Sequence, residues 1–463
     1  MKHRILYALL PIGLAALVPT QTSVQAANDS DTYRQLDQLM DVFERVRANY
    51  VEEVSDEQLL EGAIDGMLAS LDPHSSFVAA RDFDSLRTQT DGEYGGLGLS
   101  VTMEDGVVKV IAPTDDTPAS RAGIMAGDYI THIDDELIYG LSLGEAVDKM
   151  KGLPGTPIGL TIVREGADKP IEVTLERAII EVKPVRWEVE DNVGIVRITT
   201  FNKQTGEATR DAIDAIEKAE GDDLLGFIVD LRSNPGGLLD QAIEVTDAFV
   251  RDGAEIVSQR GRDKGDVQRY FARSGDRADG RPVIVLVDAG SASASEIVAG
   301  ALQDHRRGLV IGTQSFGKGS VQTLIPLGTD TALRLTTARY YTPSGRSVQE
   351  KGIEPDITVP QLSDEFRADR RIVRESDLRQ VLRNADVADD SFIEEDDKDN
   401  PRFALTTEDL EASGVEDYQL HYAIDILRRQ TGASELATAQ PKTEADETEE
   451  TAQADTADAT PEG

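Results

Sequence analysis

"LLGFIVDLRSNPGG", residues 224–237, decides the fold class of this chain. It is an apolar run that ends in Asn-Pro-Gly-Gly, which is typical of a buried strand followed by a turn. The next segment, "LLDQAIEVTDAFV" at residues 238–250, has apolar residues at helical spacing. An apolar strand that runs directly into a helix is typical of a parallel sheet covered by helices.

The same alternation continues on both sides of this stretch. Strand-like segments are "VGIVRITTF" at 193–201 and "RPVIVLVDAG" at 281–290, and helix-like segments are "EATRDAIDAIEKAE" at 207–220 and "SASEIVAGALQDH" at 293–305. We therefore expect an α/β core at residues 178–360 with a mostly parallel sheet.

Three further regions surround this core. Residues 92–177 contain short β-rich runs separated by turns and have the size of one small β-rich module. Residues 27–90 are predicted to be helical, with an apolar face that includes Leu36, Leu39 and Met40 and with Ser55 as a helix N-cap. Residues 361–430 are predicted to form another helical region.

The two ends of the chain have distinct compositions. In residues 1–26, Lys2 and Arg4 precede an apolar stretch, and the segment ends in a small residue, Ala26. This order is typical of a secretory signal peptide. We therefore expect an exported, periplasmic protein cleaved near Ala26, with an uncleaved inner-membrane anchor as the alternative. The tail at residues 431–463 is rich in Ala, Thr, Asp and Glu, and a disordered acidic tail is expected there.

Composition excludes several classes of function. The chain has 47 basic and 86 acidic residues and a net charge of −39, so its surface repels nucleic acids and no nucleic-acid partner is expected. It has no cysteine, which excludes disulfides and thiolate nucleophiles. Paired histidines at zinc spacing are absent, so neither a metal nor another cofactor is expected.

The segment "GTQSFGKGSVQ", residues 312–322, has three interpretations. A phosphate-binding loop is rejected, because Gly319 stands where the magnesium ligand is needed and a strand, not a helix, follows. In the second interpretation Ser315 is the nucleophile of a Ser-x-x-Lys acyltransferase, although the Ser-Asp-Asn and Lys-Thr-Gly elements of those enzymes are missing. In the third, Lys318 is a general base for a serine elsewhere in the chain.

A lysine base must be neutral near pH 7, which requires burial in an apolar site. Between Leu309 and Gly328 the sequence has no acidic residue. The best partner serine lies in "DAGSASASEIVAGAL", residues 288–302, where a strand-to-helix turn would expose it beside free backbone N–H groups. The alternative is a helix start of small residues in which Ser293 or Ser295 is only the N-cap.

Seven motifs occur together in order along the chain. They are "LDPHSSF" at 71–77, "YGGLGLSV" at 94–101, "TPA" at 117–119 with "RAGIMAGD" at 121–128, "DLRSNPGG" at 230–237, "GSASASEIVAGALQD" at 290–304, "TQSFGKGSVQ" at 313–322 and "YYTPSGRSVQEKGIEPDI" at 340–357. This ordered set resembles the carboxyl-terminal processing proteases, also called tail-specific proteases, a family of serine–lysine peptidases. The resemblance extends from about Leu71 to Val359.

The resemblance implies roles for particular residues. The catalytic residues would be the nucleophile Ser293, the general base Lys318 and Gln322, which orients the lysine. The oxyanion donors would be the backbone N–H of Ala294 and that of Gly236 or Gly237, although Asn-Pro-Gly-Gly also suits an ordinary β-turn.

The resemblance also implies a PDZ domain at residues 92–177. Its carboxylate-binding loop would be Gly96-Leu97-Gly98-Leu99, which captures a chain terminus while the peptide adds a strand to the sheet. Lys151-Gly152 stands where relatives often have Arg-Gly. The implied fold is a crotonase- and Clp-like αβ protease core with this inserted domain. Flanking cap or dimerisation helices, at 27–90 and 361–430, imply a homo-oligomer.

The function we expect is that of an exported serine endopeptidase. It would recognise the unstructured C-terminal tails of protein substrates through its PDZ domain and cleave them at Ser293, with an adaptor protein as a further partner. A non-catalytic PDZ scaffold or chaperone for exported proteins is the alternative from another class. An acyltransferase that uses Ser315 is the third candidate.

Overall fold

The structure is a computed structural model that describes residues 22–104, 106–167, 169–263, 265–328, 331–359, 373–384, 415 and 417–430. Most of the predicted signal peptide, much of the predicted C-terminal helical region and the predicted acidic tail therefore lie outside the described residues. The chain divides into two units, Met1–Leu71 and Asp72–Gly463.

The first unit contains the helices α1 (Thr22–Asn49) and α2 (Asp56–Ala69). Ser55 is the N-cap of α2, as predicted, because its side chain accepts a hydrogen bond from Gln58 N while the Gln58 side chain accepts one from Ser55 N. The apolar face of α1 stays about half exposed at Leu36, Leu39 and Met40. None of the helices in the described residues has the length and apolar character that a membrane span requires.

The core of the second unit is a six-stranded sheet. In spatial order its strands are β10 (Val185–Glu190), β11 (Val193–Ile198), β12 (Gly226–Asp230), β15 (Val283–Val287), β16 (Gly308–Gly312) and β19 (Ile357–Thr358). All neighbours from β11 to β19 are parallel, and only β10 is antiparallel to its neighbour. The predicted α/β core with a mostly parallel sheet is therefore confirmed.

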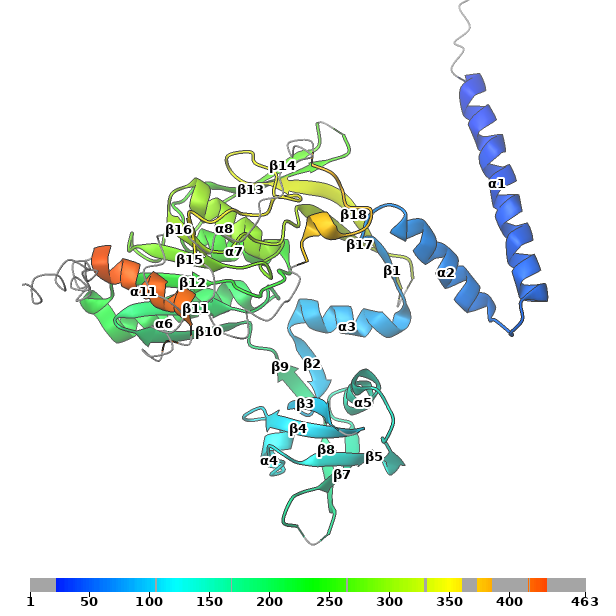
Figure 1. The fold of residues 1–463 in the computed structure, drawn as a ribbon, viewed down its shortest axis with the longest axis horizontal. Coiled ribbons are helices and arrows are strands. Elements are labelled where there is room, and N and C mark those ends of the chain that lie inside the picture. The colour runs from blue at the N-terminus through cyan, green and yellow to red at the C-terminus, as the bar shows by residue number, and fades with distance from the viewer. Residues whose placement is uncertain are drawn as a thin grey trace, which may run out of the picture. The chain divides into compact units, whose positions relative to one another are not determined.

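Helices cover both faces of this sheet (Figure 1). One face packs against α6 (Thr205–Glu220), α7 (Leu239–Asp247) and α8 (Ala294–Asp304), and the other packs against α11 (Tyr418–Gln430). Side chains alternate between the two faces along a strand, so that Val285 belongs to the first cluster and Ile284 and Leu286 to the second. Burial on both faces explains why these strands are continuous apolar runs.

A second sheet was not predicted from the sequence. It contains β1 (Ser76–Val78), β18 (Ala332–Tyr341), β13 (Glu255–Gly261), β14 (Val267–Phe271) and β17 (Ser320–Pro326). In the region predicted to be helical, α3 (Ala80–Asp91) is a helix, but β1 is a strand. β1 forms because it pairs with residues 332–334 of β18, a contact too distant along the chain to leave a local pattern.

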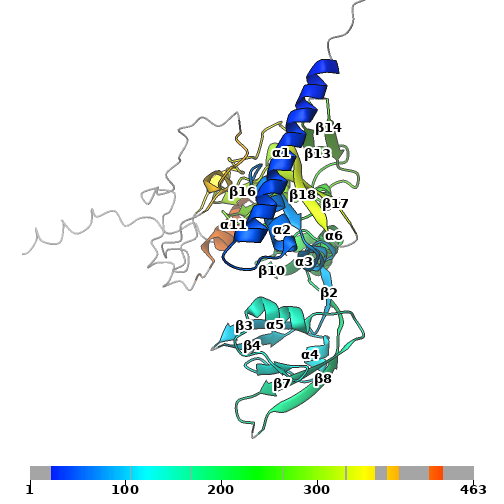
Figure 2. The same ribbon diagram turned by 90° about the vertical axis from the view of Figure 1, so that its right-hand side faces the viewer.

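The β-rich module is a separate sheet with its own core. Its strands are β3 (Leu99–Glu104), β4 (Val107–Pro113), β5 (Tyr129–Ile133), β6 (Glu136–Leu137), β7 (Pro157–Val163) and β8 (Ile171–Glu176). Its helices are α4 (Pro118–Arg121) and α5 (Leu143–Met150), and Figure 2 shows α5 alongside β3. The module is inserted between β2 (Glu93–Gly96) and β9 (Ala178–Glu181), which pair with each other.

Three loops meet at one edge of the parallel sheet. β12, β15 and β16 are consecutive neighbours, so their carboxyl ends lie side by side. The glycine loop (residues 231–238), the serine turn (residues 288–294) and the lysine loop (residues 313–319) follow these three strands. Ligand sites of open α/β sheets occur at this edge.

Candidate active site

Ser293 lies in a strained conformation at the end of the serine turn. Its φ and ψ are 55° and −112°, and α8 begins at the next residue, Ala294. A positive φ is uncommon for a residue with a side chain, and it is retained only where the surroundings enforce it. A sharp strand-to-helix turn of this kind exposes a nucleophilic serine at the edge of a sheet.

The other two serines of the Ser-Ala-Ser-Ala-Ser run have structural roles. Ser291 Oγ donates to the carbonyl of Leu231 at 2.9 Å, and Ser295 Oγ donates to the carbonyl of Asn234 at 2.9 Å. Both serines are fully buried, whereas Ser293 is partly exposed. The N-cap position of α8 belongs to Ser293 and not to Ser295. Of the three serines only Ser293 is accessible.

The glycine loop packs directly on the serine turn. A Cβ atom at Gly236 would lie 2.6 Å from Ala292 O, 2.8 Å from Ser293 Cβ and 2.9 Å from Ala294 N. Gly236 also has a φ of 95°, so both space and backbone conformation require glycine. The N–H of Ala292 donates to the carbonyl of Asn234 at 3.0 Å, which joins the two loops.

Two backbone N–H groups remain available beside Ser293. The N–H of Gly236 donates to Asn234 Oδ1 at 2.9 Å. In the part of the chain that the structure describes, the N–H groups of Gly237 and Ala294 have no acceptor. Of the three residues predicted as oxyanion donors, Gly236 is thus already engaged, while Gly237 and Ala294 can receive a developing negative charge.

Glu296 joins the serine turn to the lysine loop, and apart from its place in a motif nothing in the local sequence indicated this role. Its Oε2 accepts from Ser293 N at 2.7 Å and from Lys318 N at 3.0 Å. Its Oε1 accepts from Ser315 Oγ at 2.5 Å and from Gly317 N at 2.7 Å. This carboxylate is fully buried and brings Lys318 to Ser293 along the backbone of both loops.

Burial changes the protonation of both ionisable groups. It raises the pKa of Glu296 to about 7, against the lowering effect of its hydrogen bonds. It lowers the pKa of Lys318, which is the direction a general base needs, while the nearby carboxylates of Glu375, Glu296 and Asp72 oppose this shift. The sequence from Leu309 to Gly328 has no acidic residue, but the fold brings three carboxylates from other parts of the chain to the lysine.

Tyr340 is a further residue of the site that the sequence analysis missed. It is almost fully buried at the end of β18, where its hydroxyl donates to the carbonyl of Lys318 and is hydrogen-bonded to Ser293. The single hydrogen of the Tyr340 hydroxyl is donated to the backbone carbonyl of Lys318. In its hydrogen bond with Ser293, the Tyr340 oxygen must therefore accept from Ser293 Oγ. Burial raises the pKa of Tyr340, so its hydroxyl stays protonated.

Gln322 and Ser315 have partners other than those expected. Gln322 Nε2 donates to Ser320 Oγ at 2.9 Å and to Thr336 Oγ1 at 3.3 Å, and no hydrogen bond joins Gln322 to Lys318 among the described residues. Ser315 is buried, donates to Glu296 and accepts from Ile353 N at 2.7 Å. A buried hydroxyl group that makes two hydrogen bonds within the protein cannot reach a substrate, which argues against Ser315 as a nucleophile.

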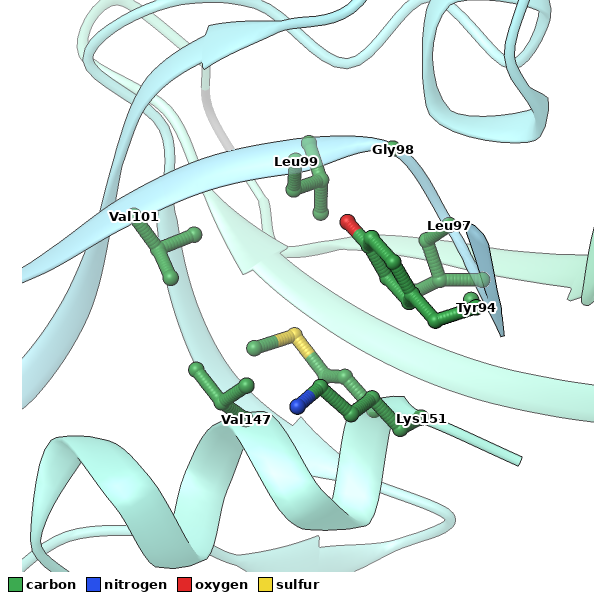
Figure 3. Close-up of a pocket in the computed structure, with 9 residues that line it drawn as sticks. Tyr94, Leu97, Gly98, Leu99, Val101, Val147 and Lys151 are labelled. Carbon is green, nitrogen blue, oxygen red and sulfur yellow. The ribbon is translucent and has the colours of Figure 1, made fainter. Parts of the chain in front are cut away.

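A groove lies between β3 and α5 in the β-rich module (Figure 3). It is lined by Tyr94, Gly96, Leu97, Gly98, Leu99, Val101, Val147, Met150 and Lys151. All four residues predicted to bind a peptide carboxylate are among them. Figure 3 shows the side chains of Leu99, Val101 and Val147 directed into the same space, so this part of the groove is apolar.

One end of this β3–α5 groove is suited to an anion. Gly98 has a φ of 76°, and a Cβ there would lie 2.3 Å from Thr117 Cβ. Within the described residues, the N–H groups of Leu97 and Gly98 have no acceptor. Lys151 Nζ lies 5.8 Å from the centre of the Tyr94 ring, at the edge of the groove. Free N–H groups beside an apolar groove can hold a terminal carboxylate.

Several parts of this chain match known protein families. Residues 192–359 match peptidase family S41, residues 95–175 match the PDZ domain, and residues 14–81 match the N-terminal domain of the activating protease CtpB. The carboxy-terminal-processing protease of Bartonella bacilliformis is 50% identical over 408 residues, which cover 86% of this chain and 94% of the relative. This chain belongs to the carboxy-terminal processing protease family.

More distant relatives extend the comparison. The carboxy-terminal processing protease CtpB of Bacillus subtilis is 35% identical over 384 residues, which cover 81% of this chain and 78% of the relative. A solved structure of a photosystem II D1 C-terminal processing protease is 30% identical, with a TM-score of 0.42, and covers 68% of this chain and 85% of that chain.

Family membership decides several of the expectations. The chain is a serine-type C-terminal processing peptidase with a PDZ domain, which binds the C-termini of peptide substrates. The predicted fold, an αβ protease core with an inserted PDZ domain, is confirmed. The non-catalytic scaffold is set aside, because the matched family is a family of peptidases.

Proposed function

We propose that this chain is an exported endopeptidase in which Ser293 is the nucleophile and Lys318 the general base. The observation that supports this most strongly is the serine turn itself. Ser293 is the accessible serine of its run, it has a strained positive φ, and it lies beside the free N–H of Ala294. Glu296 bonds the backbone at both Ser293 and Lys318, which couples the two residues.

Catalysis would follow the course of acyl transfer. Neutral Lys318 Nζ takes the proton from Ser293 Oγ, and Oγ attacks the carbonyl carbon of the substrate. The N–H groups of Gly237 and Ala294 stabilise the oxyanion. The lysine ammonium then gives its proton to the leaving amine. Lys318 next deprotonates a water molecule, which releases the acyl group and restores Ser293.

The lysine side chain must change its position for this chemistry. Among the described residues Lys318 Nζ has no hydrogen-bond partner, and Ser293 is hydrogen-bonded to Tyr340 instead. Rotation of the lysine side chain towards Oγ completes the pair. A lysine has enough rotatable bonds to do this without movement of the lysine loop, whose backbone Glu296 holds.

The β3–α5 groove would select the substrate. An extended C-terminal tail adds a strand along β3, its carboxylate binds the N–H groups of Leu97 and Gly98, and its apolar side chains contact Leu99 and Val147. Substrates are therefore proteins with unstructured apolar C-termini. Export to the periplasm is part of the proposal and rests on the signal-like composition of residues 1–26. A homo-oligomer and an adaptor protein remain further proposals that rest on the family resemblance.

The proposal is tested by cleavage of an unfolded protein that ends in a free apolar tail. Ser293→Ala and Lys318→Arg are compared with wild type, and Ser274→Ala, an exposed serine of the core, is the control. Arginine keeps the positive charge but stays protonated at all working pH values, so it cannot serve as a base. Both site variants should lose cleavage, and the control should not.

The same substrate with an amidated tail tests recognition. Amidation removes the carboxylate charge, and cleavage by wild type should become weaker because KM rises. Cleavage by Ser293→Ala or Lys318→Arg at the wild-type rate would contradict the catalytic assignment. Equal cleavage of free and amidated tails would contradict the role of the β3–α5 groove.

A further inference from the structure

The "LDPHSSF" motif at residues 71–77 has no role in the chemistry described so far. Its centre forms a tight turn held by Asp72, which is almost fully buried. Asp72 Oδ1 accepts from His74 N and from Ser75 N, both at 2.9 Å, and Oδ2 accepts from Ser75 Oγ at 2.7 Å. An aspartate that bonds the backbone two and three residues ahead makes a rigid turn.

One side of this turn leads to Gln322. Thr336 on β18 donates its N–H to Ser75 Oγ at 3.1 Å and its hydroxyl to Asp72 Oδ1 at 3.0 Å. Gln322 Nε2 lies 3.3 Å from the same hydroxyl oxygen. A carboxylate can only accept hydrogen bonds, so Thr336 must donate to Asp72 and must accept from Gln322.

This order of donors fixes the orientation of the Gln322 amide. The NH₂ group has to face Thr336 and Ser320, and it is used by both. The oxygen, Oε1, is then the group of Gln322 left to accept a hydrogen bond from a lysine. Asp72 thus determines, through one threonine, which atom of Gln322 is available to the base.

The other side of the turn leads to the backbone next to Lys318. His74 Nε2 lies 2.8 Å and 3.0 Å from the two carboxylate oxygens of Glu375, which is fully buried in the short helix η2 (Glu375–Asp377). Gln349 Nε2 donates to Glu375 Oε1 at 2.9 Å. Gln349 Oε1 accepts at 3.0 Å from the N–H of Gly319, the residue after the lysine.

Charged groups around Lys318 come from several elements. Glu375 on η2, Glu296 on α8 and Asp72 in the turn favour the ammonium form, and Arg334 on β18 disfavours it. Glu375 has the largest of these effects, although burial outweighs it and lowers the pKa of Lys318. The Glu375 carboxylate that fixes the loop therefore also acts on the protonation of the base.

We propose that the Asp72–Ser75 turn is a positioning element for the catalytic base. Asp72 acts through Thr336 on Gln322, and His74 acts through Glu375 and Gln349 on the backbone of the lysine loop. These residues touch neither substrate nor Ser293, so they are positioning residues. The inference rests on the proposed function, in which Lys318 is the base. It predicts an effect on kcat rather than on binding, because the turn does not line the β3–α5 groove.

The first test removes one hydroxyl group. Thr336→Val breaks the link between Asp72 and Gln322 but keeps the backbone bond to Ser75, and Thr336→Ser keeps both. The matched control is Thr337→Val, the next residue on β18, whose hydroxyl pairs with exposed Thr323. Thr336→Val should lower kcat by about 10- to 100-fold with KM unchanged, Thr336→Ser should restore the rate, and Thr337→Val should equal wild type.

The second test uses the pH dependence of kcat for Glu375→Gln. Glutamine keeps an oxygen for Gln349 but removes the charge that most favours protonated Lys318. The pKa of Lys318 should fall, so the acidic limb of the profile should move to lower pH. A purely structural role would reduce the rate without moving this limb.

The outcomes separate the two proposals. The positioning role is wrong if Thr336→Val keeps the wild-type kcat, or if the acidic limb of the Glu375→Gln profile does not move. In either case the proposed function still stands as long as Lys318→Arg is inactive. A higher KM with unchanged kcat in Thr336→Val would also overturn the positioning role. Activity in Lys318→Arg would refute the proposed function itself. If thermal unfolding shows that Thr336→Val does not fold, the positioning role is judged only by whether the acidic limb of the pH profile moves in Glu375→Gln.

Discussion

The serine turn and the β3–α5 groove are built in opposite ways. Around Ser293, polar groups are buried and bonded to one another, and a single carboxylate accepts four hydrogen bonds. The groove is apolar and open, and its polar groups are backbone N–H donors still without acceptors in the described residues. The first arrangement holds the side chains in fixed positions. The second leaves apolar surface and N–H donors that an incoming peptide can bind. Changes in the two sites should therefore affect different kinetic constants.

The largest effect should come from Gly236→Ala, which breaks the contact between the glycine loop and the serine turn. The new Cβ meets backbone atoms of Ala292 and Ala294 that cannot yield, so Gly237 and its N–H are displaced. Loss of an oxyanion donor should lower kcat by about 10³-fold. Gly253→Ala is the control, since its φ of 77° is also positive but open space surrounds it. A fall in kcat of similar size in both variants would contradict the steric argument.

Glu296→Gln should have the next largest effect, about 10²-fold in kcat. Each carboxylate oxygen accepts two hydrogen bonds, so an amide places its NH₂ against two donors in either orientation. The control is Glu145→Gln, an exposed glutamate at the same capping position of α5. Unchanged kcat in Glu296→Gln would show that the serine turn does not depend on this carboxylate.

The pH dependence of the wild-type enzyme also tests the role of Glu296. The pKa of Glu296 is about 7, so lowering the pH through this value protonates the carboxyl group and removes hydrogen-bond acceptors from both loops. Protonation of Lys318 acts in the same direction. Peptidase activity should fall as the pH drops below about 7 while binding of a tail peptide changes little, which kcat and a direct binding titration can compare. Parallel loss of binding and activity would contradict the separation of the two sites.

Tyr340→Phe should have a moderate effect, about tenfold in kcat. It removes a buried hydroxyl that bonds both Ser293 and the carbonyl of Lys318. Tyr341→Phe is the matched control, because the ring of Tyr341 packs on Arg260. A change in KM alone would place Tyr340 in substrate binding instead.

The smallest effect on the reaction should come from the groove. Val147→Asp introduces a charge between β3 and α5 and should raise KM for a tailed substrate about fivefold with kcat unchanged. Val163→Asp, on the same module outside the groove, is the control. A loss of kcat in Val147→Asp would mean that the two sites are not separable.

The parts of this molecule that could be predicted from sequence are those encoded by neighbouring residues. The apolar strands of the parallel sheet and the N-cap at Ser55 follow from local patterns, whereas the four residues proposed to bind a carboxylate came from the family resemblance. Asn234 and the two glycines after Pro235 likewise predict a turn after β12.

Contacts between distant residues could not be predicted in this way. β1 exists because it pairs with β18, and the pairing of His74 with Glu375 joins residues 301 positions apart. The sequence around Lys318 lacks acids, yet the fold places Glu296, Glu375 and Asp72 near it. The side chain of Asn234 likewise decides which N–H of the two glycines is free: its Oδ1 accepts from Gly236 N, while Gly237 N has no acceptor in the described residues.

Covalent labelling tests directly whether Lys318 activates Ser293. A serine-reactive phosphonate would be incubated with wild type, Ser293→Ala and Lys318→Arg over a range of pH, and the labelled peptide identified by mass spectrometry. We predict a single label on Ser293, formed faster as the pH rises, and no label in either variant. A label on Ser315, or labelling of Lys318→Arg at the wild-type rate, would show that Ser293 and Lys318 are not the nucleophile and its base.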